Sequence, residues 1–119
     1  MKKSILNIIE KYNLKEDLKL LLSLENPDND PDLPPVYKGK EEFVYNSLEY
    51  IPKIIKIIKE KTGIELGSPM VCQGTDDDNL DFYWKTDNYS LLANVLEDSG
   101  VSYYMMDSKH EKLAEGKLD

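Results

Sequence analysis

The hydrophobic period of the chain changes near Gly67, and this change constrains the fold more than any other feature. Between Glu41 and Lys61, apolar residues recur every three or four positions, as they do on the buried face of a helix. After Gly67, apolar and polar residues alternate, as they do on strands with one buried face. A chain with both periods is expected to pack helices on a sheet, because neither element can bury its apolar side alone.

Residues 1–62, which precede the change of period, divide into three segments. Residues 1–24 carry isoleucines and leucines at helical spacing with a break at Asn13, which predicts one bent helix or two short ones. Residues 25–39 contain four prolines and four acidic residues, which predict an extended, solvated connection. Residues 40–62 predict a long amphipathic helix, and Pro52 is expected either to bend it or to start a second segment.

Residues 68–118 predict an antiparallel meander of four or five strands. Four alternating runs are clear, and a fifth strand would lie in "KLAEGKL". The connections "GTDDDN", "KTDN" and "EDSG" are rich in residues that favour turns, and short connections make consecutive strands antiparallel. We therefore expect one α+β domain, in which the N-terminal helical segment and the long helix pack on this meander.

The charge of the chain limits the partners that it can bind. The sequence has 15 basic and 23 acidic residues, a net charge of −8, and every basic residue is a lysine. Without arginine the chain has no bidentate donor for phosphate or guanine, and its acidity repels a nucleic-acid backbone. We expect no direct binding of nucleic acid. An acidic surface suits a basic protein, although solubility is the commoner reason for it.

The sequence favours a cytoplasmic protein without a membrane anchor. Two lysines and an apolar run open the chain as in a signal peptide, but Asn7, Glu10 and Lys11 interrupt that run. No apolar stretch approaches the length of a membrane-spanning helix. Cys72 is the single cysteine, so an intrachain disulfide is excluded.

Two stretches of the chain follow one another in an order that is also found in other proteins. These are "NPDNDPDLPPVYKGKEEFVYNSLEYIPKI" and "SPMVCQGTDDDNLDFYW". In this order they resemble a group of small uncharacterised prokaryotic proteins, in which an acidic W-D-G-x-G-A-x-P segment precedes an amphipathic helix and then P-x-V-x-P-x-x-D-G-x-I-x-L-x-W. The tryptophan and glycines of the first motif are absent here, and Asp78-Asn79 replaces the Asp-Gly of the second. The resemblance implies an α+β fold and no particular activity.

Three consecutive aspartates, Asp76, Asp77 and Asp78, stand shortly before Trp84, which we expect in the core. Adjacent residues of an extended segment cannot all point to one side, and a hard cation needs several more oxygen ligands. We therefore expect neither a metal nor a cofactor. The aspartates are interpreted as a turn that starts a hairpin, with an acidic partner-binding loop as the functional alternative.

The chain contains residue types that could form a catalytic site, but the sequence does not indicate that they lie together. Cys72 and His110 could form a nucleophilic pair oriented by Asp107, yet nothing in the sequence brings them together. Cys72 shares a strand face with Met70, and we expect it to be buried. Because no assembled nucleophile, metal set or phosphate loop is visible, we predict a chain without catalysis. A small-ligand-binding or hydrolytic domain that uses the space between helix and sheet is the alternative.

The outer face of the predicted sheet is more apolar than a solvated face should be. If Trp84 faces the helix, then Tyr83, Tyr104 and Met106 face away, together with Leu92 or Leu96. The N-terminal helix, a second copy of the chain or another protein could cover this face.

We predict a protein-interaction surface of Tyr83, Tyr104 and Met106, flanked by Asp76, Asp77 and Asp78, since Tyr and Met are enriched in interface cores. The expected function is that of a small acidic interaction module. One concrete form is an inhibitor of a nucleic-acid-binding protein, either a phage or mobile-element counter-defence protein or an antitoxin.

Overall fold

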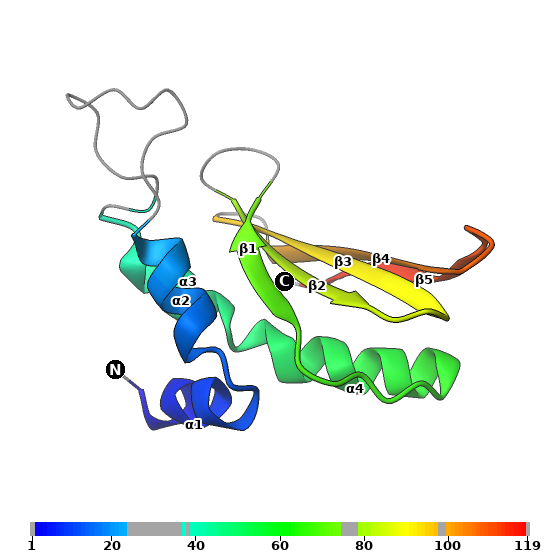
Figure 1. Cartoon of the computed structure of the whole chain (residues 1–119), viewed down its shortest axis with the longest axis horizontal. Helices are drawn as coiled ribbons and strands as arrows, with labels where there is room; N and C mark the ends of the chain where they lie inside the picture. Colours follow the sequence, from blue (N-terminus) through cyan, green and yellow to red (C-terminus); the bar gives the residue numbers. More distant parts are fainter. Residues whose placement is uncertain (1, 24–36, 38, 75–78, 98–99, 119) are drawn as a thin grey trace.

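The structure, a computed structural model, describes residues 2–23, 37, 39–74, 79–97 and 100–118. Within these residues, four helices precede five strands (Figure 1). The predicted α+β fold with N-terminal helices and an antiparallel meander is confirmed. The elements are α1 (Lys3–Lys11), α2 (Lys15–Leu22), α3 (Glu41–Ser47), α4 (Tyr50–Thr62), β1 (Met70–Gln73), β2 (Leu80–Lys85), β3 (Tyr89–Leu96), β4 (Gly100–Asp107) and β5 (Lys112–Leu118).

The first helical segment breaks at Asn13, as predicted, and the second breaks shortly before Pro52, the predicted position. Asn13 adopts a left-handed conformation with φ of 55°, which ends the first helical path and lets α2 start in a new direction. The long helix divides at Leu48 and Glu49 into α3 and α4. Pro52 therefore lies in the first turn of α4, where a missing N–H leaves no helical hydrogen bond unmade. Gly63, with φ of 77°, ends α4.

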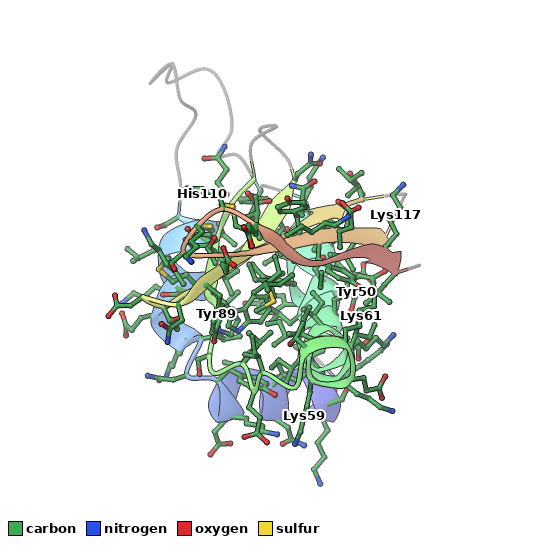
Figure 2. The ribbon with its side chains drawn as sticks, turned by 90° about the vertical axis from the view of Figure 1, so that its right-hand side faces the viewer. Tyr50, Lys59, Lys61, Tyr89, His110 and Lys117 are labelled. Atoms are coloured by element: carbon green, nitrogen blue, oxygen red, sulfur yellow. The ribbon has the colours of Figure 1, made fainter. Side chains whose placement is uncertain are left out.

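The sheet has the simplest antiparallel order, β1-β2-β3-β4-β5, and α4 lies under one face of it (Figure 1). We call the face toward α4 the inner face and the opposite face the outer face. Side chains of the inner face and α4 fill the space between them (Figure 2). Trp84 is buried there, as predicted, and its indole N–H donates to the carbonyl of Gly67 at 2.8 Å.

Each edge strand is bonded to a helix by one charged side chain. At the β1 edge, α2 packs against the strand and Asp17 Oδ2 accepts a hydrogen bond from the Val71 N–H at 3.1 Å. At the β5 edge, Lys61 at the end of α4 donates to the Tyr103 hydroxyl at 2.8 Å and to the Glu115 carbonyl at 3.2 Å. These contacts fix both edges of the sheet to the helices.

Within the described residues, none of the helices has both the length and the apolar character needed to span a membrane.

Candidate protein-interaction face

A row of apolar side chains crosses the outer face of the sheet. Met70, Tyr83, Leu92 and Tyr104 are direct partners in the registers of β1 through β4, so their side chains lie side by side about 4.8 Å apart from strand to strand. Met70 is 54% exposed, Leu92 41% and Tyr104 43%. We call these four residues the apolar row.

The period of two along each strand creates this row. Trp84 and Leu91 point into the core, so Tyr83 and Leu92 beside them must point outward. Leu92 lies on β3, the central strand, with one tyrosine on each side. The apolar row therefore crosses the middle of the face, where contact with another surface would be most extensive.

The structure places the predicted interaction residues as follows. Tyr83 and Tyr104 lie in the apolar row, and Met106 lies on the same face two positions further along β4. Asp76, Asp77 and Asp78 lie outside the described residues, so the predicted flanking loop stays a prediction. Met70 was missing from the predicted surface because alternation alone does not say which residues of a four-residue strand face outward.

The described helices leave the outer face open. Helices α1 and α2 stand beside β1 and α4, and α4 lies against the inner face (Figure 1). The N-terminal helices therefore do not provide the cover that an apolar outer face requires. The reason is that their own apolar stripes, which include Ile5, Leu14 and Leu18, are buried in the core that α4 shares.

A polar row runs parallel to the apolar row on the same face, through Cys72, Asp81, Asn94, Ser102 and Lys117. Asp81 is only 6% exposed, and Asn94 Nδ2 donates to its Oδ1 at 2.5 Å. Burial raises the pKa of the Asp81 carboxyl, and the hydrogen bond from Asn94 opposes part of this effect. A carboxylate at this position is thus held in an environment that disfavours its charge.

The prediction that Cys72 is buried was wrong. Val71 takes the inward position of β1, so Cys72 faces outward and is exposed. The pKa of the Cys72 thiol is raised. Partial burial is the largest cause, and the negative charges of Asp81 and Asp17 add to it. The thiol is therefore accessible but less often ionised than a free cysteine at the same pH.

The candidate catalytic residues do not meet. Cys72 lies at one edge of the sheet, and His110 follows β4 near the other end of the strands. Three strands and about five residues separate them, or about 20 Å. The Asp107 carboxylate instead accepts hydrogen bonds from the backbone N–H groups of Lys109 and Glu111, and these bonds stabilise the turn. Among the described residues, no group of three acidic, histidine or cysteine side chains could hold a metal ion.

Shallow hollows lie on both sides of the apolar row. One, of about 500 Å³, is bounded by Leu92, Tyr104 and Lys117. The other, of about 400 Å³, is bounded by Tyr83, Met106 and other residues near the turns. An uneven apolar surface of this kind can receive side chains from another protein.

A cleft of about 580 Å³ lies away from this face. It is beside α3, the start of α4, the last residues of β3 and the first residue of β4. Phe43 and Tyr50 contribute aromatic surface to it. Its charged lining residues balance, since three are lysines and three are glutamates: Lys2, Lys40, Lys53, Glu42, Glu49 and Glu97. The described charged residues that line this cleft therefore sum to zero net charge.

No family model, curated protein or solved structure matches the chain in comparisons with known proteins.

Proposed function

We propose that the chain is a protein-interaction module without catalysis that binds another protein through the outer face of its sheet. The observation that carries the proposal is the apolar row, which lies in the middle of the face with Leu92 and Tyr104 more than 40% exposed. A solvated antiparallel sheet normally shows polar side chains at such positions. An exposed apolar patch bordered by polar residues is typical of an interaction site.

The size of the apolar row limits what it can contribute to affinity. Burial of one large apolar side chain is worth roughly 1.5–3 kcal/mol when it starts fully exposed, so these four partly exposed ones contribute about 4 kcal/mol in total. This gross gain does not exceed the roughly 4–15 kcal/mol that association costs in lost freedom of motion, so the apolar row alone gives no appreciable affinity. The proposed partner must therefore add polar or charged contacts to bind at cellular concentrations.

The net charge of −8 favours a basic partner. One concrete form of the proposed function is an inhibitor that occupies the basic groove of a nucleic-acid-binding protein, as a counter-defence protein or an antitoxin would. A second copy of the chain is the other partner that an exposed sheet face allows.

Capture experiments with charged substitutions test the proposal. Immobilised wild type, Leu92→Glu, Tyr104→Glu and Leu20→Glu would be compared in a lysate of the organism that encodes the chain, with bound proteins quantified by mass spectrometry. Leu20 is 67% exposed on α2 and serves as the matched control. We expect one or more proteins that both sheet variants lose and the control retains. The same bound proteins on all four would contradict the proposal.

The cleft beside α3 supports a second candidate, a small-ligand-binding or hydrolytic domain. Its volume of about 580 Å³ is within the range of ligand pockets. The space between α4 and the sheet, by contrast, is filled by core side chains. A ligand in the cleft would raise the melting temperature in a screen of nucleotides and divalent cations, and Tyr50→Ala would abolish that increase.

A further inference from the structure

The charge of the chain is concentrated in the half that forms the sheet. Residues 68–119 contain 11 acidic and 4 basic residues, a net of −7, whereas residues 1–67 contain 12 acidic and 11 basic residues, a net of −1. Two copies of the chain would each bring a net charge of −8 to a complex, and these like charges would oppose their association. A basic protein is attracted by the same distribution.

Asp81 is the acidic residue of the outer face best placed to meet that partner. Glu115, the other carboxylate that the described strands place on the face, is already paired with Lys112 at 3.0 Å. Asp81 has no cationic partner among the described residues. Lys117, the lysine of its own row, is three strands away, or about 14 Å, and Lys85 is four residues further along β2, or about 13 Å. Both lie too far away for an ion pair.

One oxygen of the Asp81 carboxylate remains available from outside. Asn94 occupies Oδ1, and no described residue donates to Oδ2. Every fully buried side-chain oxygen or nitrogen among the described residues has a hydrogen-bond partner, so the unbonded Oδ2 must still reach the surface. Burial already disfavours the charge of this carboxyl, and a cation that arrives at Oδ2 would compensate it.

We propose that Asp81 is the anchoring residue of the outer face, where it receives a lysine or arginine side chain of a basic partner whose apolar residues cover Tyr83 and Leu92. This inference rests on the proposed function, because it uses the same face. Asn94 fixes the carboxylate, so that little rotational freedom is lost when the ion pair forms. The pair supplies the charged contact that the apolar row lacks, and its position next to that row would give the partner a fixed register.

Selection from a library of random linear peptides tests the inference while the natural partner is still unidentified. Peptides that bind wild type would be counter-selected on Leu92→Glu, so that only those that need the apolar row remain. We expect the remaining peptides to share one lysine or arginine next to aromatic or aliphatic residues. Their affinity should fall about tenfold or more on Asp81→Asn, which keeps the size of the side chain. It should be unchanged on Glu111→Gln, which removes the same charge from an exposed turn.

A double-mutant cycle separates the ion pair from any other effect of Asp81→Asn on the face. Replacing the shared cation of the peptide by glutamine should weaken binding to wild type but not to Asp81→Asn. Selected peptides without a shared cation, or equal losses on both proteins, would overturn the role of Asp81 and leave the proposed function intact. Failure to select any peptide that depends on Leu92 would overturn both. Sedimentation of wild type as a dimer that Leu92→Glu dissociates would replace the basic partner with a second copy.

Discussion

At the scale of single residues, Asp81 makes the stability of the fold depend on pH. Burial raises its folded pKa above the ordinary value of 3.8, so the folded state holds the proton more tightly than the unfolded state does. The free energy of unfolding therefore falls as pH rises from the ordinary pKa through the folded one. We expect Asp81→Asn, compared with wild type by urea denaturation, to gain relative stability as the pH is raised from about 4 to about 7. A constant difference across this range would contradict the assignment.

Cys72 gives a second prediction at this scale. Its raised pKa means that the thiolate fraction, and with it the rate of alkylation by iodoacetamide, is lower near pH 8 than for a free cysteine. Because negative charge contributes to this effect, Asp17→Asn should increase the rate at a fixed pH. Glu10→Gln on α1 is the control, and it should leave the rate unchanged. Equal rates for wild type and Asp17→Asn would show that Asp17 does not influence the thiol.

At the scale of elements, the contact between β5 and β4 depends on a glycine. A Cβ on Gly116 would lie 2.6 Å from the Tyr103 hydroxyl oxygen, and Lys61 holds that hydroxyl in place. We expect Gly116→Ala to destabilise the protein by about 2 kcal/mol, a fall in Tm of roughly 8 °C. Gly67→Ala is the control, since a Cβ there meets no atom within 4 Å. Equal melting temperatures of the two variants would contradict this account of the β5 contact.

The elements also show how far sequence patterns reach. The helix break at Asn13 and the second segment that starts near Pro52 were predictable, because local backbone chemistry decides them. Trp84 was predictable as core because its strand alternates over six residues. The outward position of Cys72 was not, since β1 has four residues and its register with β2 depends on distant contacts such as the one between Asp17 and Val71.

The candidate site was predictable only in part. Tyr83 and Tyr104 followed from alternation, but their alignment with Leu92 and Met70 depends on the registers of three strand pairs. Asp81 does not stand out in the sequence, because an aspartate on a solvated face is ordinary. Its significance comes from its burial and from the absence of a cation near it among the described residues.

At the scale of the whole molecule, charge is expected to control association. Residues 68–119 carry seven of the eight net negative charges. Because two copies repel each other, the isolated chain should sediment as a single copy of 13.7 kDa near physiological salt. Its complex with a basic partner should weaken as salt is added, because the ions screen the attraction. Analytical ultracentrifugation over a salt series checks both points. A complex that strengthens with salt would point to apolar contacts alone.

The most direct measurement of the central claim is the alkylation rate of Cys72 with and without a bound partner. Cys72 is the only cysteine of the chain and is exposed on the outer face, next to the apolar row. Saturation with a protein that the wild-type chain captures is predicted to slow alkylation at least about tenfold, because a partner bound to the outer face covers the thiol. An unchanged rate at saturation would show that the partner binds elsewhere and would contradict the assignment of the outer face as the interaction surface.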